Sequence, residues 1–196
     1  MTIATSIPVK KTNQSRLNTV DFKNLGFGNY ISDHMLVAKY DKGTWQEPEI
    51  IPYGDLMLSP AMLSLHYGQA VFEGMKAFHM NDGAINIFRV ERHHKRLNKS
   101  LARMCMPAIG EDLFTAGLEA IVKTDAAWIP KDSGSSLYLR PVVFASEAKL
   151  GVKVADQYLF VILTSPVGPY FSKPVRLKVE LEYVHLDGSQ GCRLLQ

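Results

Sequence analysis

The stretch Leu65-His66-Tyr67-Gly68-Gln69-Ala70-Val71-Phe72-Glu73-Gly74-Met75-Lys76-Ala77-Phe78 decides how the rest of the chain is interpreted. It mixes aromatic, small and ionisable residues, and no single amphipathic period fits it. Gly68 and Gly74 permit tight backbone geometry or the close approach of another group. A largely apolar segment with a phenol and a carboxylate is typical of a pocket lining. A core strand that bends at each glycine explains the same residues equally well.

Length and composition restrict the class of protein. The chain has 196 residues, 46% of them hydrophobic, which predicts a globular domain rather than a disordered chain. The net charge of +3 is too small to indicate nucleic-acid binding. Two cysteines, Cys105 and Cys192, make neither a disulfide framework nor a metal cluster, so a cytoplasmic location is expected. No apolar run reaches the length of a membrane span. Residues 1–20 are polar and predict a disordered tail.

Turn residues and periodicity predict the elements of the first half. Residues 33–40 and 45–52 are expected to form two strands joined by a turn at 41–43. Ser59 and Pro60 have the residue types of an N-cap and a first helical position, which predicts a short helix there. A second hairpin is expected from 75–80 and 84–88, around Asn81-Asp82-Gly83.

Two helices and two strong strands are expected next. Residues 91–104 place His94, Leu97, Leu101 and Met104 at helical spacing, and residues 111–123 predict a second helix. Residues 136–146 and 157–165 predict strands. Residues 166–174 are rich in proline and glycine and predict a linker, 175–184 predict one further strand, and 185–196 predict no element. The fold class expected is therefore α+β, with a small domain over residues 21–165.

Two places have residue types suited to binding anions. Strand periodicity puts Tyr138 and Arg140 on one face, where a phenol and a guanidinium bind a carboxylate, or simply stack on each other. Arg96 lies on a basic helix and is suited to a phosphate ligand if a pocket is near, or to a solvated surface if none is. The adjacent His93 and His94 point apart on a helix, which predicts structural roles rather than a metal site.

These segments together resemble one family. The sequences at 66–68 and 72–78, 136–141, 150–152 and 165–171, in this order, closely resemble branched-chain amino acid aminotransferases, which are fold type IV pyridoxal-phosphate enzymes. The resemblance runs from about residue 22 to residue 184. It implies the small N-terminal domain of that fold, followed by only the first strand of the large domain.

The resemblance also implies roles for individual residues. Arg96 matches the arginine that binds the phosphate of pyridoxal 5'-phosphate, and Arg140 matches the arginine for the side-chain carboxylate of 2-oxoglutarate or glutamate. The implied substrates are leucine, isoleucine or valine with 2-oxoglutarate, and the implied assembly is a homodimer. The remaining implied substrate-binding residues are the aromatics Phe27, Phe72, Tyr138 and Tyr170, Tyr67 from across the dimer, and Leu150 and Val152 in a loop inserted by the partner subunit.

One departure limits what the resemblance implies. No lysine follows Lys178, and residues 185–196 do not match the family segment that carries the Schiff-base lysine, so no catalytic residue is assigned. A frameshift is one hypothesis for these residues; a natural truncation or a gene-model error are the others. The chain as given is expected to hold the cofactor weakly and to be inactive.

Two alternatives to a transaminase stay open. One is a non-catalytic fragment or dimerisation module. The other is a different fold type IV enzyme, such as a D-amino acid aminotransferase or a pyridoxal-dependent lyase. The residues at 138–140 and 167–170 favour the branched-chain group over the latter. Neither nucleic acid nor a membrane is expected as a partner.

Overall fold

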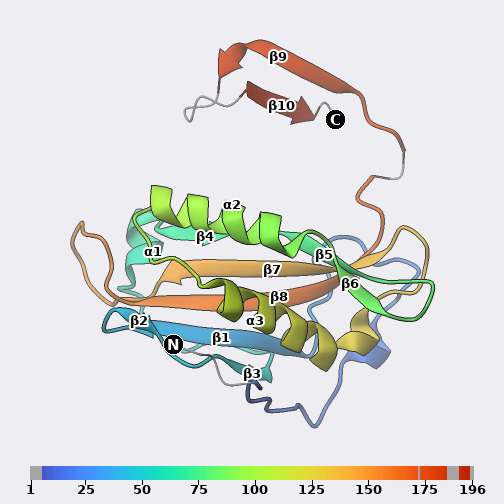
Figure 1. Ribbon diagram of the computed structural model, residues 1–196, viewed down its shortest axis with the longest axis horizontal. Helices are drawn as coiled ribbons and strands as arrows, with labels where there is room; N and C mark the ends of the chain where they lie inside the picture. Colours follow the sequence, from blue (N-terminus) through green and yellow to red (C-terminus); the bar gives the residue numbers. More distant parts are fainter. Residues whose placement is uncertain (1–5, 172, 185–189, 195–196) are drawn as a thin grey trace.

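The computed structural model describes residues 6–171, 173–184 and 190–194. Its centre is an eight-stranded sheet in the order β2-β1-β8-β7-β5-β6, with β3 paired to β1 and β4 paired to β7, all antiparallel (Figure 1). The strands of this sheet are β1 (His34–Asp41), β2 (Thr44–Trp45), β3 (Glu49–Pro52), β4 (Ala70–Phe72), β5 (Met75–His79), β6 (Ile85–Ile87), β7 (Ser136–Ala145) and β8 (Tyr158–Val167). The helices are η1 (Leu17–Thr19), α1 (Leu63–Tyr67), α2 (Val90–Arg103), α3 (Glu111–Thr124) and η2 (Ala126–Trp128).

The two long helices cover one face of the sheet and form the main core with it. α2 contributes Leu97 and Leu101, and α3 contributes Phe114 and Leu118, all fully buried. β7 alternates, with Leu137, Leu139, Val143 and Ala145 in this core. The α+β fold class expected from the sequence is therefore confirmed. Met104, expected on the buried stripe, is 37% exposed because α2 ends one residue before it.

The opposite face of the sheet carries a smaller apolar cluster. Met35, Val37, Leu159 and Val161 are buried there, and partly buried residues including Ile51, Leu56 and Leu58 pack against them. Tyr138 and Arg140 alternate with the core-facing residues of β7 and so belong to this second face.

The segment before β1 is ordered, contrary to the expected disordered tail. From residue 6 to residue 20 the chain packs along the sheet, and Val9 forms a parallel bridge with Ile50 of β3. The Ile50 N–H donates to Pro8 O at 2.9 Å, and the Lys10 N–H donates to Ile50 O at 2.8 Å. The sequence prediction failed because these partners lie about forty positions away along the chain. The rest of the predicted tail, residues 1–5, lies outside the described residues.

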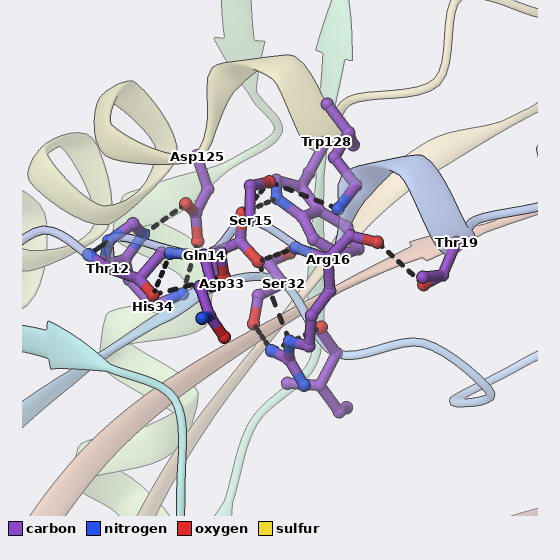
Figure 2. Close-up of polar contacts among 12 residues, drawn as sticks. Thr12, Gln14, Ser15, Arg16, Thr19, Ser32, Asp33, His34, Asp125 and Trp128 are labelled. Carbon is purple, nitrogen blue, oxygen red and sulfur yellow. Dashed lines mark hydrogen bonds and ion pairs between the residues drawn. The ribbon is translucent and has the colours of Figure 1, made fainter.

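The buried carboxylate of Asp33 binds the later part of this N-terminal segment, at Ser15 and Arg16 (Figure 2). Asp33 accepts hydrogen bonds from Ser15 Oγ at 2.5 Å, from the Arg16 N–H at 2.8 Å and from Trp128 Nε1 at 3.0 Å. Burial raises the pKa of Asp33, but these hydrogen bonds and the charge of Arg16 outweigh burial and hold the pKa below its usual value. Asp33 is therefore ionised at neutral pH and joins the N-terminal segment to η2, just after α3.

His34, the residue after Asp33, also connects the N-terminal segment to the end of α3. His34 Nδ1 lies 2.6 Å from Asp125 Oδ1, with both side chains buried. His34 Nε2 accepts the N–H of Thr12 at 3.0 Å, so this nitrogen carries no proton and Nδ1–H donates to the carboxylate. Both ring nitrogens have structural partners, and the arrangement leaves neither available for chemistry.

Several expected boundaries are wrong. The predicted strand 45–52 is interrupted between β2 and β3, where Pro48 has no N–H to donate. α1 begins at Leu63 rather than at Ser59-Pro60; Ser59 Oγ instead accepts the N–H of Ala61 at 3.2 Å in the preceding turn. β8 extends through Val167, which is 2% exposed and pairs with Ser136, so the predicted linker can begin only at residue 168.

The final described residues form a separate antiparallel pair, β9 (Leu177–Val184) and β10 (Gln190–Leu194). The pair has an irregularity between Gln190 and Cys192. β9 coincides with the strand expected at 175–184. β10 falls in the stretch for which the sequence indicated no element, and residues 185–189 and 195–196 lie outside the described residues.

Candidate active site

Two aromatic rings, those of Phe72 and Tyr138, lie beside Arg140 on the face of the sheet opposite α2 and α3. β5 and β7 pair with Lys76 opposite Tyr138, and β4 and β7 pair with Phe72 opposite Val142. This register places Phe72, Tyr138 and Arg140 on the same face, because side chains of one parity share a face. The phenol–guanidinium pair expected from periodicity is therefore present.

Two further aromatic rings reach this group from distant parts of the chain. The Phe27 ring lies 5.0 Å from the Tyr138 ring and 5.7 Å from the Tyr170 ring, both edge-on. Tyr170 arrives there because β8 runs to the beginning of β7, where Val167 pairs with Ser136. We call the resulting set the Arg140 cluster: Phe27, Phe72, Tyr138, Arg140 and Tyr170.

Arg140 has no acidic partner within this cluster. Its Nε donates to the Tyr138 hydroxyl at 3.1 Å, and its guanidinium carbon lies 4.4 Å from the centre of the Phe72 ring. Among the residues whose side chains the structure describes, no carboxylate forms an ion pair with Arg140. A half-buried guanidinium oriented by a phenol and a ring is suited to bind a carboxylate from outside the chain.

Gly74 fits Tyr138 closely. A β-carbon at this position would lie 2.2 Å from the Tyr138 hydroxyl and 2.9 Å from Cζ of the ring. Any larger residue would displace the ring from its position beside Arg140. The glycine is therefore required by the close approach of a side chain.

Arg96 is held at one edge by a buried glutamate. Its Nε donates to Glu73 Oε1 at 2.5 Å and its Nη2 donates to Glu73 Oε2 at 2.7 Å. His93 Nδ1 lies 2.9 Å from Oε2 of the same carboxylate. The Glu73 side chain is only 4% exposed, whereas the Arg96 side chain is 63% exposed. Arg96 therefore has a fixed inner edge and an outer side that faces solvent.

The charges of this pair follow from its contacts. Burial raises the pKa of Glu73, but the hydrogen bonds from Arg96 and His93 and the charge of Arg96 outweigh it, so the pKa lies below the usual value. The hydrogen bond to Glu73 in turn raises the pKa of Arg96, with a smaller contribution from Tyr138. Glu73 is ionised and Arg96 is protonated at neutral pH.

Three predicted site residues lie away from the Arg140 cluster. Tyr67 ends α1, and Leu150 and Val152 lie in the loop after β7, with exposures of 46%, 73% and 88%. The loop is tied to α1, since the Lys149 N–H donates to Ala61 O at 3.0 Å. This end of β7 is opposite to the end that carries Tyr138 (Figure 1).

Sequence reasoning assigned no individual role to Glu73 and only a structural role to His93. A signal was present for Glu73: with strand period 2 it shares a face with Val71 and Met75, both buried. A carboxylate on a core-facing position requires a charged partner. His94 has the structural role expected of it, with Nε2 donating to Ile109 O at 2.8 Å.

No helix in the described part of the chain has the length and apolar character needed to cross a membrane.

A scan against protein-family models finds no match. A search of curated proteins finds branched-chain-amino-acid transaminase 1 of Bacillus subtilis, 47% identical over 177 residues, which are 87% of this chain and 50% of the relative. The chain thus spans about half the length of the curated relatives it matches.

Solved structures agree with this relationship. A branched-chain aminotransferase of Thermoproteus uzoniensis, solved with norvaline, matches 73% of this chain and 44% of its own at a TM-score of 0.54 and 26% identity. A T.th. branched-chain amino acid aminotransferase, solved with pyridoxamine 5'-phosphate, matches 69% of this chain and 41% of its own at a TM-score of 0.50 and 24% identity. Together with the curated relatives, these matches show that the chain belongs to the branched-chain amino acid aminotransferases of fold type IV.

Proposed function

We propose that this chain provides the substrate-carboxylate and cofactor-phosphate sites of a branched-chain amino acid aminotransferase. The proposed substrates are leucine, isoleucine or valine, with 2-oxoglutarate as the amino acceptor. The observation that carries the proposal is Arg140, a cation in an aromatic cluster without an acidic partner among the described side chains. The family relationship supplies the reaction type.

The Arg140 cluster suits both kinds of substrate. Phe27, Phe72 and Tyr170 present exposed ring surface, with exposures of 49%, 62% and 66%, against which an aliphatic side chain gains contact. The guanidinium beside them binds the second carboxylate of 2-oxoglutarate or glutamate through charge-assisted hydrogen bonds. One site can therefore accept apolar and acidic side chains in turn.

Arg96 fits the phosphate of pyridoxal 5'-phosphate. The solved relative with pyridoxamine 5'-phosphate supports this choice of cofactor. The outer side of the Arg96 guanidinium is exposed and cationic, and its inner edge is already occupied by Glu73. When bound, the cofactor supplies the electron-withdrawing ring through which amino groups are transferred. The residues of this chain contribute the orientation of its phosphate.

Tyr67, Leu150 and Val152 support a homodimer. Arg140 and Ala145 are five residues apart on β7, which is about 17 Å at 3.3 Å per residue. Tyr67, Leu150 and Val152 are exposed beyond that end of β7, so we propose that they serve the Arg140 cluster of a second copy rather than that of their own chain. We expect Leu150→Asp to shift the chain toward the monomer in sedimentation velocity, and Val154→Asp on the same loop to serve as a comparison.

Ligand titration tests the carboxylate site. We expect 2-oxoglutarate to perturb the NMR signals of the Arg140 cluster, and Arg140→Leu to weaken its binding about tenfold or more, as loss of a charge-assisted hydrogen bond requires. Leucine binding should change less, since its side chain has no carboxylate. Arg92→Leu, an exposed arginine on α2, is the matched control. Equal 2-oxoglutarate affinity in Arg140→Leu and Arg92→Leu would contradict the proposal.

Catalytic activity belongs, in this proposal, to the whole protein. The positions matched in this chain include no Schiff-base lysine, so we expect the 196-residue chain by itself to form no glutamate from leucine and 2-oxoglutarate. Leucine-dependent glutamate formation by the pure chain, measured by coupled glutamate oxidation, would refute that expectation while leaving the carboxylate site untouched.

A further inference from the structure

Glu73 is a buried carboxylate with an unusually complete set of donors. Arg96 provides two hydrogen bonds through Nε and Nη2, and His93 provides a third through Nδ1. The N–H of Gly74 lies 3.2 Å from Oε2. An ionised carboxylate at 4% exposure is retained only when donors of this kind replace its water. The buried Glu73 carboxylate is therefore stabilised by its ion pair with Arg96. If Arg96 moved away, the negative charge of Glu73 would stay buried without its cationic partner.

The contact restricts which part of Arg96 is available. A guanidinium has five N–H groups in a fixed plane, and Glu73 takes those on the Nε and Nη2 edge. The remaining donors, those of Nη1 and the second of Nη2, point away from the carboxylate. An exposed arginine without such a contact samples many rotamers and loses that freedom on binding. Arg96 is instead set in one orientation before any ligand arrives.

We infer that Glu73 is a positioning residue that presents the outer donors of Arg96 to a phosphomonoester. Glu73 acts through the arginine and does not itself contact the ligand. The identity of the ligand as the cofactor phosphate rests on the proposed function; the orientation of Arg96 by Glu73 does not.

The same carboxylate connects this site to the Arg140 cluster. Its donor Gly74 is the residue against which the Tyr138 hydroxyl lies, and that hydroxyl accepts the N–H of Arg140. Loss of the Glu73 charge should therefore change the orientation of Arg96 strongly and the position of Tyr138 only weakly. Glu73 forms an ion pair with Arg96, whereas it is connected to Tyr138 only through the close contact at Gly74.

Two readouts on the full 196-residue chain test the inference. The first is the Nε–H and Nη signals of Arg96 in ¹⁵N NMR, compared with exposed Arg92 on the same helix. The second is binding of pyridoxamine 5'-phosphate, which has no aldehyde to react with lysines, with pyridoxamine as the control lacking phosphate. The variants are Glu73→Gln, isosteric but uncharged, and Glu73→Asp, charged but one methylene shorter.

We expect restricted Arg96 signals in the unmodified chain that become averaged, like those of Arg92, in Glu73→Gln. Pyridoxamine 5'-phosphate should bind about tenfold more weakly to Glu73→Gln, Glu73→Asp should fall between, and pyridoxamine should be unaffected. Adding Glu73→Gln to Arg96→Leu should produce no further loss, since a positioning residue has no effect once its target is gone. If Glu73→Gln fails to fold, Glu73→Asp alone decides, through the same two readouts.

The outcomes separate the inference from the proposed function. Binding that is unchanged in Glu73→Gln, or losses that add in the double variant, would overturn the positioning role while the phosphate site stands. Arg96 signals that are averaged in the unmodified chain would overturn it as well. Restricted Arg96 signals that depend on Glu73, without any binding of pyridoxamine 5'-phosphate, would confirm the positioning and refute the phosphate ligand.

Discussion

Replacing Gly74 by alanine is the sharpest test of the Arg140 cluster. The new β-carbon would lie 2.2 Å from the Tyr138 hydroxyl, whereas ordinary contact begins at 3.4 Å, so the hydroxyl has to retreat by about 1.2 Å. We expect that movement to disrupt its 3.1 Å hydrogen bond with Arg140 and to change the packing of the Tyr138 ring against Phe27. The change adds a single methyl group, so its effects report on the fit of Tyr138 alone.

The expected cost combines overpacking with a lost hydrogen bond. Inserting a methyl into a filled site typically costs about 1–3 kcal/mol, and a hydrogen bond of this kind contributes about 0.5–1.5 kcal/mol. Alanine also restricts the conformations of the unfolded chain, which offsets about 0.4–1 kcal/mol of this cost. We therefore expect Gly74→Ala to lower the free energy of unfolding by about 0.5–4 kcal/mol, the sum of these three contributions.

Urea unfolding followed by circular dichroism measures this free energy, and a double-mutant cycle isolates its cause. In a Tyr138→Leu background the same glycine substitution should cost nearly nothing, because the clashing atoms are gone. Gly54→Ala is the control, since a β-carbon there has no neighbour within 4 Å. Equal costs for Gly74→Ala in the two backgrounds, or a cost no larger than that of Gly54→Ala, would refute the reasoning.

Three further predictions concern stability. Leu101→Ala, at a fully buried position of α2, should cost about 2–5 kcal/mol in urea unfolding, and a cost below about 1 kcal/mol would contradict the described core. Folding lowers the pKa of Asp33 from 3.8, so the ionised carboxylate stabilises the folded chain fully above that value. This stabilisation declines as the pH falls through the folded pKa. Melting temperatures of Asp33→Asn between about pH 5 and 2 should lack this decline. Gln69 joins Met104 O at 3.0 Å and Ala155 N at 3.3 Å, so Gln69→Ala should cost about 1–3 kcal/mol and speed hydrogen exchange at Ala155. Unchanged exchange there would exclude the bridging role.

The elements that the sequence predicted well are those set by neighbours within a few residues. The spacing of Leu97 and Leu101 indicated α2, the Asn81-Asp82-Gly83 turn indicated the β5–β6 hairpin, and strand alternation put Tyr138 beside Arg140. In each case the pattern that forms the element is also the pattern visible in the sequence. The membership of Phe27 and Tyr170 in the same cluster came from the family resemblance, since no local pattern brings residues so far apart together.

The errors have a common cause in long-range partners. Residues 6–20 look like a polar tail until Ile50, Asp33 and His34 supply the groups that bind them. Val167 was assigned to a linker because its neighbours are proline and glycine, yet pairing with Ser136 keeps it in β8. Glu73 has no recognisable role in the local sequence because its partner Arg96 lies 23 positions later. A local sequence pattern can indicate that a side chain needs a polar or charged partner, but it does not identify the distant residue that provides it.

Tyr67 ends α1 near the last residues of β7, whereas Arg140 lies in the middle of that strand, and this separation has a genetic consequence in the proposed homodimer. If each site combines Arg140 of one subunit with Tyr67 of the other, a subunit lacking Arg140 and a subunit lacking Tyr67 assemble into a pair with one ruined site and one intact site. Random mixing of the two inactive forms should then restore about a quarter of normal turnover, because half of the pairs are mixed and each contains one working site. Two defective alleles would support growth together where neither does so alone.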